Sequence, residues 1–377
     1  MADLFHSAGY GIVLVDESAT LITQLREAGH YTVVRAESPE RRQDVLIEGY
    51  SALSTAQTAE ISEAVAAANI LAVAVFPQHF AQVAQQLASG IAYRRAKRRD
   101  APLDVVLCTN LAHAGPQFRA LLHDAFPPEA REYMGSHIGI VESLVIRIVT
   151  KAPGELHRRE PLLVWTNGYP ELPVDRHGFK GEIPQVSGLR LVDDMRAEET
   201  RKLYTYNTFQ AALAYLGAGR GYDLAVECAT DPQVRSEAAR VLDEASQALQ
   251  TEYDFSAGEM ARWVRDVMTQ TTNPILGDKV KRLAADPRRK LSREDRLIGP
   301  TLLARKHGVE SKHLVRAIAA GLRYNDPDDP GAVYVQQRIA TLGLSAAVRE
   351  VCGLTDVELD LVEALVRNYH RPRVDKT

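Results

Sequence analysis

Three short apolar runs in the first third of the chain restrict its fold more than any other feature. They are GIVLVD at 11–16, ILAVAVF at 70–76 and DVVLCTN at 104–110, and a longer run, HIGIVESLVIRIV, follows at 137–149. Helix-like segments separate the first three. Apolar strands that alternate with helices of this length are typical of a parallel sheet that is covered by helices and buried on both faces. The sequence therefore predicts an α/β fold for this region, with each run as a strand.

The rest of the chain has a mostly helical pattern. TKAPGELHRREP at 150–161 is polar and holds two prolines, which is typical of a boundary between domains. After one more strand and a stretch rich in glycine and proline, apolar periodicity predicts helices at about 231–252, 256–270, 292–306, 311–323, 330–342, 344–351 and 356–370. We expect a parallel-sheet α/β domain at 1–152 and a mostly helical domain at 153–377.

The composition excludes several classes of protein. The chain has 377 residues, of which 45% are hydrophobic and 25% charged, and its formal net charge is −4. This charge gives no reason to expect a nucleic acid partner, and no apolar run is long enough to span a bilayer. The N-terminus lacks the pattern of a secretion signal. Cys108, Cys228 and Cys352 lie far apart, which favours a reducing cytoplasm and no metal site. We expect a cytoplasmic protein without nucleic acid, membrane or metal as a partner.

One part of the second half is distinctly basic. Residues 278–306 contain ten Lys or Arg against four Asp or Glu. Arginine offers a planar fork and lysine a point charge, and both suit a phosphate group. The candidate residues for a phosphate site are Arg289, Lys290, Arg293 and Arg296. A solvated helix whose charges form ion pairs, for example around Asp295, explains the same pattern.

Residues 195–219 predict a helix whose buried face carries polar groups. Relative to Lys202 on an ideal helix, Gln210 lies at about 80° and Asn207 at about 140°, while the apolar Leu213 lies at about 20°. One interpretation is a polar network that is satisfied inside the core. The other is catalytic: burial lowers the pKa of Lys202, so that its amine takes up a proton at neutral pH while the two amides hold an oxygen.

Asp16 ends the first apolar run, where a dinucleotide-binding fold keeps an acid for the ribose hydroxyls. An acid before a helix is also a common N-cap, so this signal has two explanations. The glycine-rich turn of such a fold is absent, because Gly9 and Gly11 lead into a strand and not out of one into a helix. We expect that either the chain begins late or the sheet is built without that first strand.

Several segments resemble a known family. They are KLYTYNTFQAALAYLG at 202–217, NPILGDKVKRLAADPRRKLSREDRLIGP at 273–300, CTN at 108–110, FKG at 179–181 and DDP at 328–330. Through them the chain resembles mannitol-1-phosphate 5-dehydrogenase and the wider polyol-specific long-chain dehydrogenases, from about Leu4 onward. The resemblance implies an N-terminal Rossmann domain and a helical substrate domain. It also implies metal-free oxidation of a secondary alcohol, with hydride transfer to a nicotinamide.

The resemblance also assigns roles to single residues. It implies that Lys202 is the general base, that Asn207 and Asn110 polarise the reacting oxygen, and that Asp16 holds the cofactor ribose. Because an acid at this position repels a 2′-phosphate, NAD is favoured over NADP. Gln210 stands where the family has a histidine, and an amide can bind a hydroxyl but cannot exchange a proton near pH 7.

Other positions depart from the family. Phe76 replaces a glycine in a turn on the cofactor side, Gly299 replaces a lysine beside the candidate phosphate site, and the glycine turn is missing. The first hypothesis is an NAD-dependent oxidoreductase, a monomer or homodimer, that acts on a polyol, sugar phosphate or related substrate. The second is a family member with a non-redox role, of dehydratase or isomerase type, or a binding role on a sugar-like molecule. If translation begins upstream of Met1, the missing turn carries no information about the chemistry.

Overall fold

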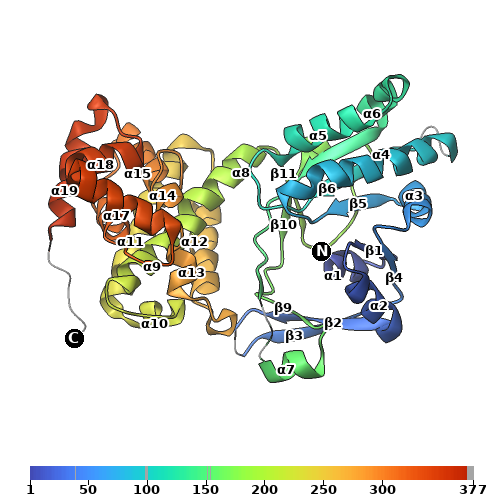
Figure 1. Cartoon of the computed structure of the whole chain (residues 1–377), viewed down its shortest axis with the longest axis horizontal. Coiled ribbons are helices and arrows are strands. Elements are labelled where there is room, and N and C mark those ends of the chain that lie inside the picture. The colour runs from blue at the N-terminus through green and yellow to red at the C-terminus, as the bar shows by residue number, and fades with distance from the viewer. Residues whose placement is uncertain (39, 98–100, 151, 153, 372–377) are drawn as a thin grey trace. The chain divides into compact units, whose positions relative to one another are not determined.

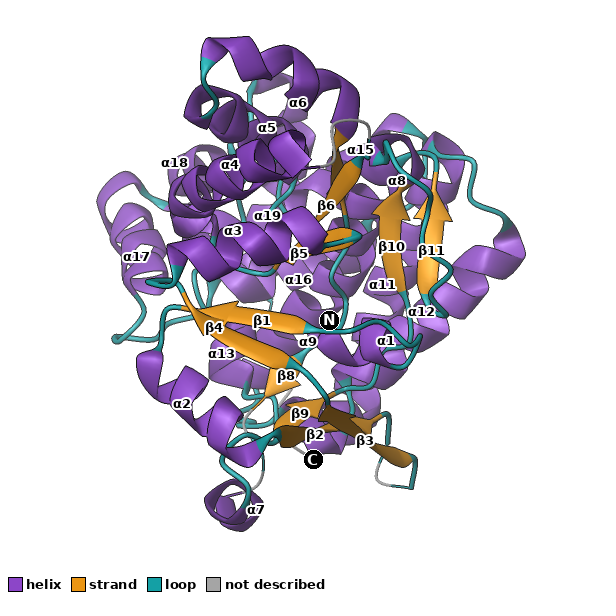
Figure 2. Ribbon diagram, turned by 90° about the vertical axis from the view of Figure 1, so that its right-hand side faces the viewer, coloured by secondary structure: helices purple, strands orange, loops and turns teal. Residues whose placement is uncertain are grey.

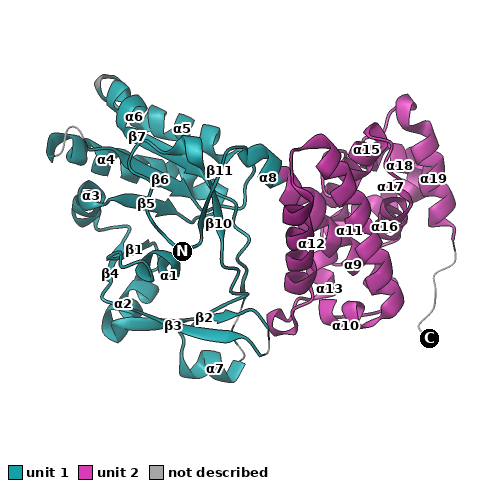
Figure 3. Ribbon diagram, turned by 180° about the vertical axis from the view of Figure 1, so that it is seen from behind, with its two compact units in different colours: residues 1–199 teal, residues 200–377 magenta. Residues whose placement is uncertain are grey.

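The computed structural model describes residues 1–38, 40–97, 101–150, 152 and 154–371. The chain divides into two compact units, Met1–Glu199 and Thr200–Thr377 (Figure 3). The first unit is of the α/β type and the second is built from helices (Figure 1). The predicted order of the two fold types is therefore confirmed. In the described parts of the chain, none of the helices has both the length and the apolar character needed to cross a membrane.

The two units divide between residues 199 and 200, whereas the predicted boundary lies between 152 and 153. Residue 153 lies outside the described residues. Later residues still belong to the first unit because their strands pair there. β9 (Val164–Thr166) lies parallel to β2 (His30–Ala36), and β10 (Leu172–Asp175) forms a bridge to Ser143. The described part of the polar segment therefore lies inside the first unit.

The largest core of the first unit surrounds a parallel sheet formed by β5 (Ile70–Val73), β6 (Leu103–Leu107) and β7 (Ile138–Glu142). The helices of this core are α3 (Thr58–Ala67), α4 (Phe80–Lys97), α5 (Ala114–Ala125) and α6 (Arg131–His137). Every residue of β6 is buried. On one face its side chains join the cluster of Phe80 and Phe118, and on the other they join Leu4 and Phe5 of α1 (Ala2–His6). The prediction of a strand buried on both faces is confirmed for β6.

β1 (Val13–Asp16) departs from that prediction. It pairs in parallel with β4 (Ser51–Ser54), and Figure 2 shows the two as a separate pair. Val13 is 47% and Val15 is 44% exposed, so the prediction that this strand is buried on both faces is wrong. Val13 and Val15 share one face of the strand, and that face is left uncovered. A doubly wound sheet has the strand order 3-2-1-4-5-6, and β4–β1 followed by β5–β6–β7 reproduces this order without strand 1. No strand of the described residues fills that position.

The remaining strands lie beside this framework. A mixed sheet has the order β3 (Arg42–Glu48), β2, β9 and β8 (Val149–Thr150), and β10 pairs in parallel with β11 (Leu189–Val192). The sequence predicted one strand over 137–149, but β7 ends at Glu142. The chain turns away there because the Ser143 hydroxyl donates to the Leu107 carbonyl, and the Leu144 N–H donates to Pro173 beside the next pair of strands. α2 (Ala19–Ala28) and α7 (Gly154–Arg159) are further helices of this unit.

Unit 2 contains the predicted helices with small shifts. They are α11 (Pro232–Glu252), α12 (Ala257–Thr271), α15 (Ile298–Lys306), α16 (Lys312–Leu322), α17 (Pro330–Leu342), α18 (Leu344–Cys352) and α19 (Leu359–Tyr369). The side chains of Asp231, Ser256 and Asp329 accept backbone N–H bonds at the starts of α11, α12 and α17, as is typical of N-caps. Over 292–306 only the second part is helical, because α14 (Pro287–Lys290) ends before it and turns intervene.

α9 (Thr208–Ala218) lies in the middle of unit 2. It packs against α10 (Ala225–Thr230), α11, α13 (Val280–Ala284) and α16. Helical structure continues through the preceding residues, α8 (Met195–Arg201) and the π-helical segment η4 (Lys202–Asn207), so the predicted helix at 195–219 is present. Its central turn is not an α-helix, however, and this changes which side chains share a face.

Candidate functional site

The π-helical segment η4 brings together two residues that a regular α-helix separates. Lys202 and Asn207 are its first and last residues, five positions apart. In an α-helix they lie about 140° apart, whereas the hydrogen bonds of a π-helix join residues five positions apart and so stack them on one side. Such turns occur frequently at functional sites. The backbone between the candidate base and a candidate amide therefore differs from the ideal α-helix on which the sequence prediction rests.

A buried cluster holds the inner side of η4 in place. Arg201 is 2% exposed, pairs with Glu259 at 2.7 Å, and has its guanidinium carbon 4.5 Å from the ring centre of Trp263. The indole Nε1 of Trp263 donates to the Thr205 hydroxyl at 2.7 Å, and that hydroxyl donates to the Arg201 carbonyl at 2.5 Å. These charged and hydrogen-bonded contacts fix the backbone from which Lys202 extends.

The three polar residues of the predicted catalytic helix differ in burial. Lys202 is buried, with 9% of its surface exposed, as periodicity predicted. Asn207 and Gln210 are half-buried. Burial disfavours the charged form of an amine, and half-buried amides can still reach a bound molecule. The arrangement can thus accept a proton and donate hydrogen bonds to oxygen, which is the chemistry that oxidation of an alcohol requires.

Gly299 leaves room for the side chain of Tyr204 in η4. A Cβ atom on Gly299 would lie 2.4 Å from the Tyr204 hydroxyl oxygen. That hydroxyl donates to the Glu294 carbonyl at 3.4 Å, and burial together with Tyr253 and Glu294 raises the pKa of Tyr204 to about 12. The resemblance implies a lysine at position 299. In this chain the space beside Gly299 is filled by the side chain of Tyr204.

Carboxylates accompany the arginines of the predicted phosphate site. Arg289 pairs with Asp286 at 3.0 Å and with Asp295 at 3.2 Å, and Arg296 pairs with Asp295 at 2.7 Å. These are the ion pairs that the alternative interpretation named. A phosphate group at this position would have to compete with two carboxylates.

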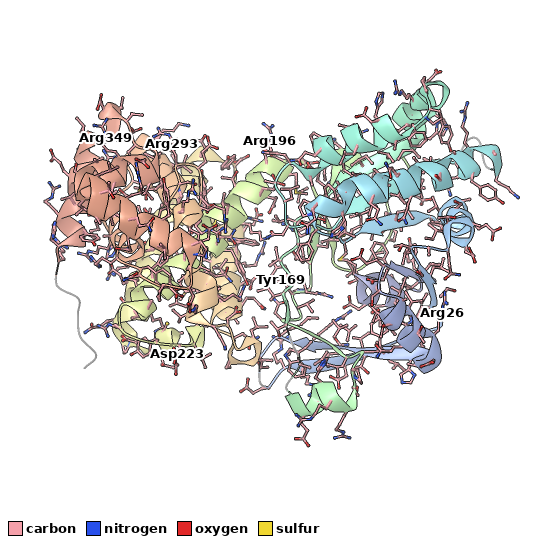
Figure 4. The ribbon with its side chains drawn as sticks, in the orientation of Figure 1. Arg26, Tyr169, Arg196, Asp223, Arg293 and Arg349 are labelled. Carbon is pink, nitrogen blue, oxygen red and sulfur yellow. The ribbon has the colours of Figure 1, made fainter. Side chains whose placement is uncertain are left out.

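The other two residues of that predicted site point to different surroundings. Arg293, labelled in Figure 4, pairs with Glu358 at 2.7 Å and donates to the Gly353 carbonyl. Lys290 is buried, and its Nζ donates to the Leu283 carbonyl at 2.5 Å. Burial and the nearby Arg296 lower the pKa of Lys290 to about 7. The structure therefore places Lys290 in the interior and Arg293 against the segment between α18 and α19.

The predicted cofactor residues follow the carboxyl ends of parallel strands in unit 1. Asp16 ends β1, Phe76 follows β5, and Asn110 follows β6. In open α/β sheets, ligands bind at this edge. Phe76 is 73% exposed and Asn110 is also exposed. The Asp16 carboxylate accepts the Ser18 N–H at 2.8 Å. The N-cap of α2 is Ser18, whose hydroxyl accepts the Leu21 N–H, so the interpretation of Asp16 as the N-cap is wrong.

Two glutamates at the same kind of edge were not found by sequence reasoning. Glu142 ends β7 and accepts the Gly115 N–H at 2.6 Å. Glu199 accepts the His113 N–H at 3.3 Å, and burial together with the charge of Glu142 raises the pKa of Glu199. The rule that singled out Asp16, an acid at a strand end, would also have found Glu142, but the predicted strand over 137–149 hid the end of β7.

The three short family motifs have structural roles. In FKG, the N–H groups of Lys180 and Gly181 donate to the buried Asp104 carboxylate at 2.7 and 3.1 Å. In DDP, Asp329 caps α17. In CTN, the Thr109 hydroxyl donates to the Val75 carbonyl at 2.8 Å and joins the ends of β6 and β5. Within the described ranges, no group of three or more His, Cys, Asp or Glu residues is arranged to hold a metal ion.

Comparisons with known proteins agree with this architecture. The model of the mannitol dehydrogenase Rossmann domain matches residues 1–188, and the model of the mannitol dehydrogenase C-terminal domain matches residues 194–368. A D-sorbitol dehydrogenase in substrate-free form is similar in structure, with 15% identity and a TM-score of 0.80 over 97% of this chain and 88% of that one. Pseudomonas fluorescens mannitol 2-dehydrogenase, in a ternary complex with NAD and D-mannitol, is similar with 16% identity and a TM-score of 0.68 over 96% of this chain and 85% of that one. The two structural likenesses establish a shared fold.

Proposed function

Because the chain belongs to the mannitol dehydrogenase family, and is therefore an oxidoreductase, we propose that it interconverts a secondary alcohol and a ketone with NAD as the hydride acceptor. The substrate class is a polyol, a sugar phosphate or a related polyhydroxylated molecule. The observation that carries the proposal is the buried Lys202 at the start of a π-helical turn that ends at Asn207.

Lys202 acts as the general base in this proposal. The neutral amine takes the proton of the substrate hydroxyl as the carbon–oxygen double bond forms, and the reverse reaction returns that proton. When bound, the nicotinamide accepts the hydride that leaves the same carbon. Asn207 and Asn110 donate amide hydrogen bonds to the reacting oxygen and stabilise the charge that develops on it.

Gln210 binds a neighbouring hydroxyl of the substrate. Its amide can donate and accept hydrogen bonds but does not titrate near neutral pH. We therefore assign it to substrate orientation and not to proton transfer. A histidine at this position would be able to do both, so the replacement leaves Lys202 as the residue that carries the proton.

The described residues fit part of the cofactor. Asp16 is half-exposed at the end of β1 and suits the hydroxyls of an adenosine ribose, and an acid there favours NAD over NADP. Phe76 offers an exposed aromatic face near the same edge. The similar mannitol 2-dehydrogenase structure is a complex with NAD, which supports the choice. We assign no residue to the pyrophosphate, because the described residues include no glycine turn between a strand and a helix.

Calorimetric titration with NAD and NADH tests the cofactor, and the near-ultraviolet absorbance of NADH then follows turnover on a panel of polyols and their phosphates. We expect binding of both forms and reduction of NAD by at least one polyol. Lys202→Ala should abolish turnover and leave NAD binding intact, whereas Lys306→Ala, which removes an exposed lysine that pairs with Glu252, should change neither. Failure to bind either form of the cofactor would refute the redox proposal.

The basic residues of 278–306 give the proposal a second test. If Arg289, Lys290, Arg293 and Arg296 hold a substrate phosphate, neutralising Arg289 and Arg293 raises KM for a phosphorylated substrate far more than for its unphosphorylated analogue. Equal effects on the two substrates would reject this site. Both arginines pair with carboxylates, so their substitution can also change stability. A change in stability affects KM for both substrates alike, whereas loss of a phosphate contact affects KM for the phosphorylated substrate alone.

A second candidate is a non-redox role, of dehydratase or isomerase type, or a binding role on a sugar-like molecule. Gln210 favours it, because an amide cannot exchange a proton near pH 7. It predicts sugar binding without NAD binding, which the same titrations distinguish. In either case we propose a cytoplasmic monomer or homodimer, and the free, buried state of all three cysteines supports a reducing compartment.

A further inference from the structure

Thr208 follows directly after the π-helical segment η4 and is the first residue of α9. Its side chain is fully buried. The hydroxyl donates to two carbonyls, that of Leu203 at 3.2 Å and that of Arg296, which share its single proton. Leu203 lies within η4, whereas Arg296 lies 88 positions further along the chain than Thr208. One buried hydroxyl therefore joins the end of the turn to a distant segment of unit 2.

The carbonyl of Arg296 needs a side-chain donor because of Pro300. In a helix, a carbonyl accepts the N–H four residues later, and Pro300 stands at that position without an N–H. The carbonyls on either side, of Asp295 and Leu297, do accept the N–H groups four residues later, at 2.9 and 3.4 Å. The sequence thus leaves the Arg296 carbonyl without that partner at the start of α15, and the Thr208 hydroxyl supplies a donor.

The backbone around Arg296 is held by its own ion pairs. The N–H and the Nε of Arg296 both donate to the Asp295 carboxylate at 2.7 Å, and Asp295 also pairs with Arg289 of α14 at 3.2 Å. The side chains of Arg296 and Asp295 are only 12% and 13% exposed. Hydrogen bonds to charged groups are stronger than those between neutral groups. The Arg296 carbonyl is therefore a fixed point to which Thr208 attaches the turn.

Two hydroxyl contacts thus attach η4 to other parts of unit 2. The Thr205 hydroxyl is bonded to α12, and the Thr208 hydroxyl is bonded to the segment before α15. The first contact lies three residues after Lys202, and the second lies one residue after Asn207. The contact at Thr205 is fixed at the beginning of the turn, and only the contact at Thr208 acts beyond Asn207. Thr208 therefore secures the end of the turn that carries the candidate amide.

From these contacts we infer that Thr208 is a positioning residue for the reaction. The inference rests on the proposed function, in which Lys202 takes the proton of the substrate hydroxyl and Asn207 binds the same oxygen. A general base must lie within about 2.6–3.2 Å of the group that it deprotonates, and a misplacement of about 1 Å can lower a rate about 100-fold. Because its side chain is fully buried, Thr208 acts through the backbone of the turn and not on the substrate.

Three variants of the full chain test the inference by their kcat for polyol oxidation. Thr208→Val keeps the shape of the side chain and removes the donor, so we expect kcat to fall about 10- to 100-fold while the affinity for NAD stays unchanged. Thr208→Ser keeps the donor and should retain most of kcat. Thr301→Val is the control for stability, because Thr301 is equally buried and its hydroxyl donates to the carbonyl of Leu297, the residue after Arg296. It should leave kcat unchanged.

An unchanged kcat in Thr208→Val, or an equal loss in Thr208→Ser or Thr301→Val, would overturn the inference. Thr208→Ala removes the same donor and serves as the second variant if Thr208→Val does not fold. Crystal structures give a readout that does not require turnover: we expect Lys202 and Asn207 to be displaced in the variant without the hydroxyl and not in Thr208→Ser. Unchanged positions would overturn the inference. Absence of turnover in the unaltered chain would count against the proposed function alone.

Discussion

The contact between Thr205 and Trp263 gives a direct test of what holds the π-helical turn. Both residues are buried, and the indole N–H has the Thr205 hydroxyl as its acceptor at 2.7 Å. Thr205→Val keeps the shape of the side chain and removes the acceptor. A buried donor left without a partner costs about 1–3 kcal/mol, so we expect Thr205→Val to lower the free energy of unfolding of unit 2 by about 2 kcal/mol.

Thr301→Val is the matched control. Thr301 is equally buried, and its hydroxyl donates to the Leu297 carbonyl four positions earlier, as the Thr205 hydroxyl donates to Arg201. It accepts no hydrogen bond from a tryptophan in the described residues. Its replacement therefore removes only a bond within one helix, with a net cost of about 1 kcal/mol or less.

Urea unfolding followed by tryptophan fluorescence measures both variants. The chain has two tryptophans, Trp165 in unit 1 and Trp263 in unit 2, so a Trp165→Phe background lets the signal report on unit 2. Equal destabilisation by Thr205→Val and Thr301→Val would refute the reasoning, because the indole N–H would then contribute nothing. If the turn also positions Lys202, Thr205→Val should lower kcat while Thr301→Val leaves it unchanged.

Three further predictions follow from single contacts. Gly299→Ala places a methyl group against Tyr204 and should cost about 1–3 kcal/mol in the free energy of unfolding, measured by urea titration; an unchanged midpoint would contradict this packing. The pKa of Glu199 is raised by burial and by Glu142, so its ionisation costs stability, and this cost appears as the pH rises above the usual glutamate value. Glu142→Gln should lower the pKa of Glu199 in a carbon-13 NMR titration, and no change would assign the shift to burial alone. Val15→Glu, at the exposed edge of β1, should reduce aggregation on heating without loss of stability; a large loss of stability would show that this edge is covered.

Local patterns in the sequence were sufficient for most helices and for the buried strand. α17 begins and ends where apolar periodicity placed it, and Asp329 before Pro330 is a capping signal that any reader of the sequence can see. Apolar residues of β6 belong to two different hydrophobic clusters, one on each face of the strand. Its run of apolar residues therefore predicted burial on both faces correctly. In these elements the local preference and the tertiary surroundings agree.

β1 shows where a local pattern is insufficient. GIVLVD has the same apolar character as the run that forms β6, yet Val13 and Val15 are half-exposed. Burial of a strand depends on its neighbours on each side, and those neighbours are set by the order of the whole sheet. Among the described residues β1 pairs with β4 alone, and the pattern of β1 itself carries no trace of this.

Helical periodicity did not predict the π-helical turn, for a different reason. A helical wheel assumes the same rotation at every residue, so it separated Lys202 from Asn207. The structure changes that rotation in one turn, and the residues that secure it, Glu259 and Trp263, lie more than fifty positions further along the chain. The backbone turn that carries Lys202 and Asn207 thus depends on side chains that are distant in the sequence, and a local sequence pattern does not reveal them. Substitution of Glu259 or Trp263 should therefore lower kcat, although neither residue belongs to the proposed catalytic set.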